Sequence, residues 1–456
     1  MGSNTSFVAD LLISIAERGR TLLDRSHRVS GATRVETLAE RCETLLSGRG
    51  EASGVALAAD ILTRYAHMKT GESIAFFEVL AEKFGPDSQR LAAALDSYAR
   101  DGVAKAAAEL HQASEPRRQE LFRRFNLAPG GTLSLVRMRE NLMEAMVRRR
   151  DLAEVDRDFA HLFASWFNRG FLVLKRIDWS TPANVLEKII RYEAVHAIRD
   201  WDDLRARVDS PDRRCYAFFH PALVDEPLIF VEVALMKETP GAIFPVLDPS
   251  RTVLRPQQAT TAVFYSISNC QKGLAGVSFG NFLIKQVLEE IARELPSLST
   301  FVTLSPVPGF RKWLDAERRA EQSVVLTTAD RKVLEKLDLP DWAANPELRD
   351  ELAAVLGPIA AYYLLAARTP KGAPVDPVAR FHLGNGARLE RINLMGDLSA
   401  KGIAQAAGLM VNYRYIPADI EKNHEAFAGK GEVVANANVR KLLKVDTASR
   451  ALVPVT

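Results

Sequence analysis

The chain has 456 residues, which is enough for two or more domains with substantial cores. Its 60 basic and 57 acidic residues leave a net charge of +3, and this balance argues against nucleic acid as the main partner. A hydrophobic content of 47% and a charged content of 26% are typical of an ordinary soluble protein.

The three cysteines give no sign of a structural site. Cys42, Cys215 and Cys270 lack metal-ligand spacing and are too few for a disulfide framework, so we expect a reducing compartment. The first 30 residues are interrupted by charges such as Asp10 and Glu17, and they resemble neither a signal peptide nor a membrane span. Together these features predict a cytoplasmic protein without membrane partners.

Residues 1–170 are predicted to be a helical domain. Leu11, Leu12 and Ile15 repeat at helical spacing, and the alanine-rich stretch 91–110 has high helix propensity. Strand-like runs and constellations with evident chemistry are missing from this half. The apolar face at Leu11 to Ile15 is wider than packing within one bundle requires, which favours self-association, although the rest of the chain could also cover this face.

The composition changes near Gly170, and residues 171–456 are predicted to form a second domain that contains a sheet. Its strand-like runs are apolar and β-branched, and its helices show a period near four. We expect strands at 171–174, 215–220, 226–235, 262–268, 301–304 and 409–415, helices at 182–192 and 279–295, a helical insert at 313–367, and a long connection at 240–260.

The stretch 262–310 is the most informative part of the second domain. A buried strand is followed by a glycine-rich turn at 271–276, an amphipathic helix, and a second strand that ends at Ser305. A glycine turn before a helix N-terminus can present backbone N–H groups to a diphosphate. Neither Gly-x-x-x-x-Gly-Lys-Ser/Thr nor Gly-x-Gly-x-x-Gly is matched, so a tight connection explains this turn equally well.

Single residues with possible chemistry each have a structural alternative. Ser305 follows a strand and precedes a proline, which is also typical of a strand-terminating turn. His382 lies between Phe381 and Leu383, and we interpret this segment as an apolar strand next to a turn, where a histidine is often a core residue. Cys270 could be a nucleophile or a buried thiol, and Tyr415 could face a site or close the core.

Several blocks in fixed order resemble the signature blocks of the malonyl-CoA decarboxylase family. The likeness extends from about Phe171 to Tyr415, while the helical first half is similar in character only. The blocks are Arg213-Arg214-Cys215-Tyr216, Glu226-Pro227-Leu228, Phe264 to Ser268, Gln271 to Val287, Leu304 to Phe310, Phe381 to Ala387 and Asn412-Tyr413-Arg414-Tyr415.

This resemblance implies an α+β fold, in which the helical bundle is followed by a mixed-sheet domain like the GNAT acyltransferases, with acyl-CoA in a cleft where the sheet splays. It implies that Ser305 and His382 are catalytic, that both also contact substrate, and that Tyr415 is a neighbouring hydrogen-bond donor. The substrate-binding segment maps onto Gln271, Gly273, Ala275, Gly276, Val277, Ser278, Phe279, Gly280 and Asn281.

Two positions depart from the patterns that the resemblance suggests. The GNAT loop, Arg/Gln-x-x-Gly-x-Gly/Ala, fits imperfectly, since reading its glycine as Gly276 puts Gly273 where Arg or Gln is usual. Ser278 stands where animal-type relatives have an acidic residue, which leaves the proton path open. Neither departure affects the assignment of CoA as part of the substrate.

The resemblance implies conversion of malonyl-CoA to acetyl-CoA and CO2 by a homotetramer in fatty acid or malonate metabolism. The enolate left by loss of CO2 needs hydrogen-bond donors and a proton rather than a metal or other cofactor. We assign His382 as proton donor, through its imidazolium, and Ser305 as a partner of the malonyl carboxylate or of His382 that acts as proton acceptor. The rivals are an acyl-CoA N-acyltransferase, which needs an amine acceptor, and a scaffold that binds acyl-CoA without turnover.

Overall fold

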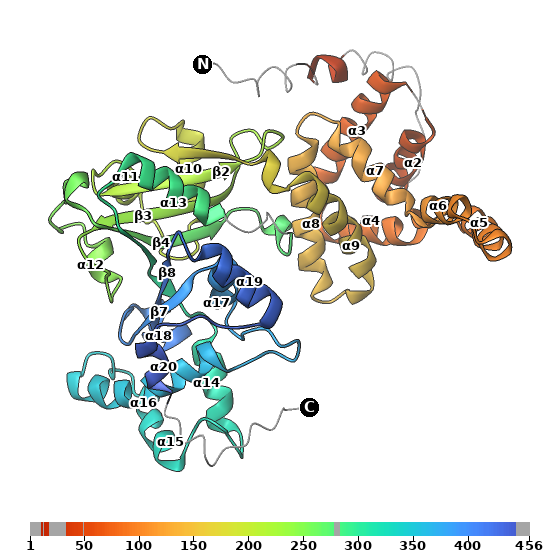
Figure 1. Ribbon diagram of the computed structural model, residues 1–456. Helices are drawn as coiled ribbons and strands as arrows, with labels where there is room; N and C mark the ends of the chain where they lie inside the picture. Colours follow the sequence, from red (N-terminus) through yellow and green to blue (C-terminus); the bar gives the residue numbers. More distant parts are fainter. Residues whose placement is uncertain (1–10, 12, 18–32, 49, 278–282, 444–456) are drawn as a thin grey trace. The chain divides into compact units, whose positions relative to one another are not determined.

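The computed structural model describes residues 11, 13–17, 33–48, 50–277 and 283–443 (Figure 1). Within them the chain forms two compact units. The first contains the described residues up to Val173, together with Phe218–Leu228 and the segment that begins at Cys270; the second contains the rest. The expected fold class is confirmed, because a helical region is followed by a mixed sheet with helices.

The first unit consists mainly of helices that bury aromatic side chains. Phe122 stacks on Phe159 with ring centroids 4.1 Å apart, and Phe163 packs against Phe159 in turn. Thr33 and Glu36 form a capping box at the start of the first described long helix. The helices are α2 (Arg34–Leu46), α3 (Glu51–Ala66), α4 (Thr70–Lys83), α5 (Ser88–Asp101), α6 (Ala104–Ser114), α7 (Arg117–Asn126), α8 (Gly131–Met146) and α9 (Ala153–Trp166), with 3-10 turns at Arg150–Leu152, Arg169–Phe171 and Lys272–Leu274.

An eight-stranded sheet, most of which belongs to the second unit, forms the framework of that unit. Its strand order is β1-β2-β3-β4-β5-β8-β6, and β7 pairs with β8. The predicted strands within 215–235 and at 262–268, 301–304 and 409–415 are all present, whereas β1 begins two residues later than expected. The strands are β1 (Val173–Ile177), β2 (Arg213–Phe219), β3 (Pro227–Met236), β4 (Thr261–Asn269), β5 (Thr300–Thr303), β6 (Ser305–Pro306), β7 (Arg388–Asn393) and β8 (Met410–Tyr415).

Two parallel strands at the centre of the sheet part after only four residue pairs. β4 and β5 pair from Thr261 with Thr300 to Phe264 with Thr303, and the N–H of Leu304 still donates to the carbonyl of Phe264. Beyond that point β4 continues to Asn269 with β3 as its partner. The chain after β5 turns instead to β8, through Ser305 opposite Val411. Such a parting of parallel strands is the splayed sheet that the GNAT-like resemblance implies.

Helices cover this sheet and extend from its C-terminal part. Figure 1 shows α17, α18, α19 and α20 gathered near β7 and β8. The long connection at 240–260 contains one short helix and a 3-10 turn rather than irregular chain throughout. The helices are α10 (Ala183–Tyr192), α11 (Trp201–Val208), α12 (Phe244–Leu247), α13 (Leu283–Glu294), α14 (Phe310–Arg319), α15 (Thr328–Leu334), α16 (Pro346–Leu365), α17 (Pro377–Gly384), α18 (Ala400–Ala406), α19 (Ile420–Lys430) and α20 (Ala437–Leu442), with 3-10 turns at Pro256–Gln258 and Glu335–Asp338.

One predicted element is wrong. His382 lies in the last turn of helix α17, not on a strand. Asp376 caps this helix through its side chain, and Pro377 occupies its first turn. Both are helix-start signals, but in a segment of eight residues they predict a helix only weakly. Among the described residues, no helix has the length and apolar character of a membrane span.

Candidate active site

At the point where β4 and β5 part, side chains replace the regular ladder between β5 and β8. The side-chain amide of Asn412 donates to the carbonyl of Thr303 at 2.7 Å, and the N–H of Tyr413 donates to the Thr303 hydroxyl at 3.0 Å. All three residues are buried. Because the Thr303 hydroxyl accepts from main chain, the strand can bend at Leu304 and bring Ser305 to the edge of β8 without leaving this buried N–H unpaired.

Ser305 and His382 meet at this bend, although 77 residues separate them in the chain. Ser305 Oγ lies 3.1 Å from His382 Nε2, and it donates to Thr303 Oγ1 at 2.9 Å. On the other side of the ring, His382 Nδ1 lies 2.9 Å from the Tyr415 hydroxyl. The three residues that the resemblance implied as catalytic are therefore in one hydrogen-bonded chain, with Thr303 at its end.

The directions of these hydrogen bonds define one tautomer of His382. Since Ser305 directs its only proton to Thr303, it accepts from His382, whose hydrogen is then on Nε2. Nδ1 accepts from the hydroxyl of Tyr415, which burial keeps protonated by raising its pKa far above the ordinary value. The network thus presents the imidazole as a neutral donor toward Ser305.

Packing fixes the plane of the imidazole ring. Tyr413 stacks on His382 with centroids 4.7 Å apart, and Phe381 packs against the ring from its own helix. The turn after α17 requires glycine at Gly386, where φ is +81° and a Cβ atom would come within 2.1 Å of the carbonyl oxygen of Ile420. Gly386, in the block Phe381 to Ala387, therefore serves the close packing of the turn after α17 rather than chemistry.

Burial decides the resting charge of His382. The side chain is 3% exposed, and burial lowers its pKa to about 3. The ring is consequently neutral near neutral pH in the free protein, so the imidazolium expected from sequence is not its resting form. Asp376, at the start of the same helix, is also buried, and its pKa is raised to about 6.

A cavity of about 260 Å³ opens beside Ser305 and His382. It lies where β4 and β5 part, and its walls are mostly apolar. Such walls strengthen electrostatic interactions inside, because little water screens them. The cavity is lined by Val195, Phe264, Tyr265, Ile267, Asn269, Ser305, Pro306, Pro377, Val378, Phe381 and His382.

The glycine turn belongs to the first unit, whereas Ser305, His382 and Tyr415 belong to the second. Gly273 packs so closely on α8 that a Cβ atom would lie 1.9 Å from the carbonyl oxygen of Val136. Arg139 of the same helix donates to the carbonyls of Gly273 and Ala275 at 2.9 and 3.0 Å. Close packing against α8 is therefore sufficient reason for a glycine at Gly273.

Several hydrogen-bond donors of the glycine turn already have partners within the protein. Leu274, Ala275 and Val277 donate their N–H groups to carbonyls inside the loop, and the Gln271 side chain donates to the carbonyl of Pro227 at 3.0 Å. Gly276 has φ +77° and open space around its Cα. Ser278, Phe279, Gly280 and Asn281 lie outside the described residues. The role of this segment in binding substrate stays a prediction.

Other candidates are resolved by burial and geometry. The Cys270 thiol is buried, as its structural alternative predicted. Within the described ranges, no group of three His, Cys, Asp or Glu side chains could hold a metal ion. Sequence reasoning missed Thr303 and the stacking of Tyr413. The one signal for Thr303 was its position two residues before Ser305, in a strand.

The fold and site define a class of protein: an α+β enzyme whose buried serine–histidine pair lies at the parting of two parallel strands. The chain belongs to the malonyl-CoA decarboxylase family. Residues 170–453 match the malonyl-CoA decarboxylase C-terminal domain, and residues 84–167 match the N-terminal domain of that family.

Relatives support the same assignment over most of the chain. The mouse mitochondrial malonyl-CoA decarboxylase is 35% identical over 397 residues, which cover 80% of each chain. The crystal structure of the Rhodopseudomonas palustris enzyme is 58% identical, covers 90% of this chain and 100% of its own, and superposes with a TM-score of 0.88. The structure of the Agrobacterium vitis enzyme is 56% identical, with coverages of 89% and 99% and a TM-score of 0.85.

Thr303 is expected to be a positioning residue for Ser305. Thr303→Val removes the hydroxyl that accepts from Ser305 and from the Tyr413 N–H, so we expect kcat to fall roughly tenfold with little change in KM. Thr303→Ser keeps the hydroxyl and should stay within about twofold of the parent chain. Steady-state kinetics and melting curves of both variants make the test; a fully active Thr303→Val would show that Ser305 does not depend on this contact.

Proposed function

We propose that this chain converts malonyl-CoA to acetyl-CoA and CO2 as a carboxy-lyase, with the Ser305–His382 pair as its acid–base centre. The observation that carries the assignment of residues is the contact between Ser305 Oγ and His382 Nε2 at the edge of an apolar cavity. Membership of the malonyl-CoA decarboxylase family supports the substrate. An N-acyltransferase, the rival with the same cleft, would additionally need space for an amine acceptor and a base.

The burial of His382 suggests how the proton is supplied. In the free protein the ring is neutral, since burial lowers its pKa to about 3. A malonyl carboxylate brought into the cavity would favour the charged ring, because an opposite charge nearby raises the pKa of a histidine. The ring would then take up the one proton that each turnover consumes.

The same electrostatics would drive the second half of the reaction. When the C–C bond breaks, its electron pair moves to the thioester enolate and neutral CO2 leaves. The carboxylate that stabilised the imidazolium is then gone, so His382 becomes a strong acid beside C2 and can protonate it. Ser305 would turn its proton from Thr303 to the carboxylate and still accept from His382 Nε2. The oxygen of Tyr415 would accept from Nδ1 of the charged ring. Neither a metal nor another cofactor takes part in this scheme; CoA is part of the substrate.

Ser305→Ala and His382→Asn should each lower kcat by roughly two orders of magnitude or more, because each removes an acid–base group. Binding of acyl-CoA should largely survive. Ser299→Ala and His161→Asn, two exposed positions that line no part of the cavity, are matched controls. CO2 release from malonyl-CoA without any amine is the assay, and near-normal kcat in either variant would remove that residue from the mechanism.

The proton cycle can be followed with the same variants. Calorimetry of malonyl-CoA binding in buffers of different ionisation enthalpy reports protons taken up. At neutral pH we expect Ser305→Ala to take up roughly one proton per site on binding, and His382→Asn to take up close to none. Equal uptake by both variants would place the proton on another group.

We also propose that Gly276 and the residues after it hold the CoA diphosphate through backbone N–H groups. Gly276→Asp should weaken acyl-CoA binding by charge repulsion, but φ is +77° there, so any side chain also strains the turn. Gly276→Asn is therefore the control, since asparagine is isosteric, uncharged and tolerant of this conformation. A tighter Kd for Gly276→Asn than for Gly276→Asp supports the cradle; equal affinities of folded variants argue against it.

We propose that the chain assembles into a homo-oligomer, a tetramer as the resemblance implies. Leu95, Tyr98 and Val103 on the α5–α6 hairpin are 54%, 42% and 54% exposed, which is unusual for apolar side chains on neighbouring helices. Three buried cysteines agree with the cytoplasmic location that we propose, although animal relatives are named mitochondrial.

Point substitutions in the intact chain test this assembly better than truncation near Gly170, because Phe218–Leu228 belongs to the helical unit. We expect light scattering to give about 200 kDa, four times the 50.4 kDa chain, and Leu95→Glu with Val103→Glu to lower it. Leu127→Glu, at a residue that is also 54% exposed, is the control and should leave the mass unchanged. A parent chain that is a monomer at micromolar concentration defeats the proposal.

A further inference from the structure

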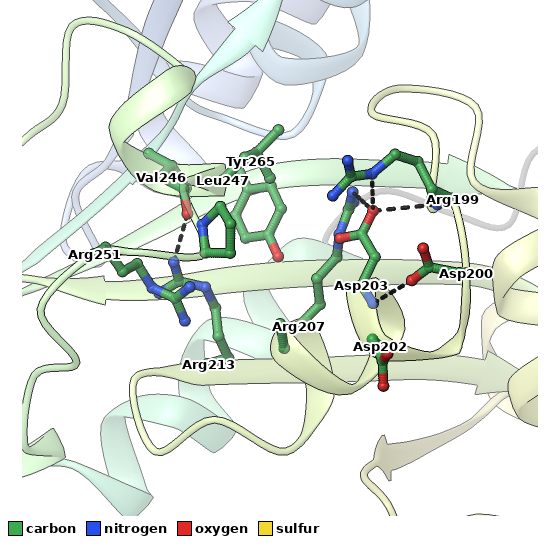
Figure 2. A pocket seen from close by; sticks show the side chains of 12 residues that line it. Arg199, Asp200, Asp202, Asp203, Arg207, Arg213, Val246, Leu247, Arg251 and Tyr265 are labelled. Atoms are coloured by element: carbon green, nitrogen blue, oxygen red, sulfur yellow. Dashed lines mark hydrogen bonds and ion pairs between the residues drawn. The ribbon is translucent and has the colours of Figure 1, made fainter.

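A second cavity in the catalytic unit is lined by arginines and is separate from Ser305 and His382. Its volume is about 180 Å³ (Figure 2). It is bounded by residues of α11, by the β3–β4 connection and by Tyr265, in the middle of β4. The lining residues are Arg199, Asp200, Asp202, Asp203, Ala206, Arg207, Arg213, Val246, Leu247, Pro249, Arg251 and Tyr265.

Tyr265 directs an unpaired hydroxyl into this cavity. Its side chain is 2% exposed, and among the described residues the hydroxyl has no hydrogen-bond partner. Figure 2 shows the oxygen pointing between Arg213 and Arg207. Burial raises the pKa of Tyr265 well above its ordinary value, so the group remains a donor. A buried hydroxyl without a partner is unfavourable, which favours an acceptor inside the cavity.

Arg213 is a buried cation with too little negative charge around it. It is 3% exposed and donates to the carbonyls of Asp212 and Val246. Its carboxylate partner, Asp212, lies 3.2 Å away and is shared with Arg251 at 2.9 Å. Two guanidinium groups thus face one carboxylate. Burial lowers the pKa of Arg213, and the positive charge of Arg251 adds to this effect. A buried charge of this kind is stabilised by a further anion.

The positive excess is local to Arg213 and Arg251, because the other charged residues of the lining are two arginines and three aspartates. Arg207 pairs with Asp203 and with Glu232, and Arg199 pairs with Asp203 as well. Burial, with Glu193 nearby, raises the pKa of Glu232 to about 8, so this carboxyl group is largely neutral at pH 7. Asp200 accepts from the N–H of Asp203 as the cap of α11, and Asp202 is exposed at the rim.

We propose that this cavity binds a small oxyanion, a carboxylate or inorganic phosphate, whose oxygens accept from the Tyr265 hydroxyl and from the guanidinium groups of Arg213 and Arg251. Arginine forks match the geometry of both kinds of oxyanion. The volume suffices, since a cavity of about 150 Å³ accommodates a molecule as large as benzene. Tyr265 also lines the cavity of Ser305, so the ligand would contact the strand that forms a wall of the active site.

Calorimetric titration of the full chain without malonyl-CoA tests the proposal. Sodium phosphate, acetate and malonate are separate arms at constant ionic strength, with chloride as the reference anion. We expect saturable binding in at least one oxyanion arm, and the arms distinguish phosphate from carboxylate. Tyr265→Phe should weaken this binding roughly three- to tenfold, the effect of one hydrogen bond. Arg251→Gln should weaken it roughly tenfold or more, because a charge-assisted contact is lost.

Arg205→Gln is the matched control. Arg205 is on the same helix α11 as Arg207, but it pairs with Asp209 and does not line the cavity. The Kd of the Arg205→Gln variant for the oxyanion should stay within about twofold of the Kd of the parent chain. If Tyr265→Phe fails to fold, the Arg251→Gln variant alone tests the proposal. Arg251 is nearer the surface, at 14% side-chain exposure, so we expect its substitution to be tolerated. Absence of saturable binding in every oxyanion arm, or binding that Arg251→Gln does not weaken, would overturn the proposal, because Arg251 lines this cavity and not that of Ser305.

Discussion

The catalytic unit depends on the interruption of the parallel pairing between β4 and β5. After Phe264 and Thr303 the two strands diverge. On the other side of β5, the regular pairing with β8 ends at Val302 and Arg414, which would leave buried main-chain groups unpaired. Asn412 and the Thr303 hydroxyl supply the missing contacts between β5 and β8, with hydrogen bonds of 2.7 and 3.0 Å. This substitution of side-chain for main-chain hydrogen bonds opens a cavity in the sheet and brings Ser305 to its edge.

The apolar surroundings of His382 are part of the proposed chemistry. A histidine on the surface would titrate near pH 6.5, and it would hold its proton with similar strength before and after CO2 leaves. Burial lowers the pKa of His382 to about 3, so only a nearby anion can keep the ring charged. The charge of the substrate and the loss of that charge can therefore control when the proton is bound and when it is released.

Local patterns predicted most of the sheet. Runs such as 262–268 and 301–304 are apolar and β-branched, and they form β4 and β5 within one or two residues of the expected bounds. The helix of His382 was missed because eight residues span about two turns, too few for a helical period, while Phe381 and Leu383 around it suggest a strand. The cap at Asp376 and the proline at Pro377 were usable signals, but such signals are weak in a short segment.

The sequence by itself determined the helical first half, most strands of the sheet, the family through its separated blocks, and Ser305, His382 and Tyr415 as candidates for the site. Only the tertiary structure decided that these side chains form one hydrogen-bonded chain that ends at Thr303, and that the ring of His382 is neutral at rest. It also revealed that the Tyr265 hydroxyl is unpaired beside Arg213. Contacts and burial of this kind join residues far apart in the chain, and no local period or propensity records them.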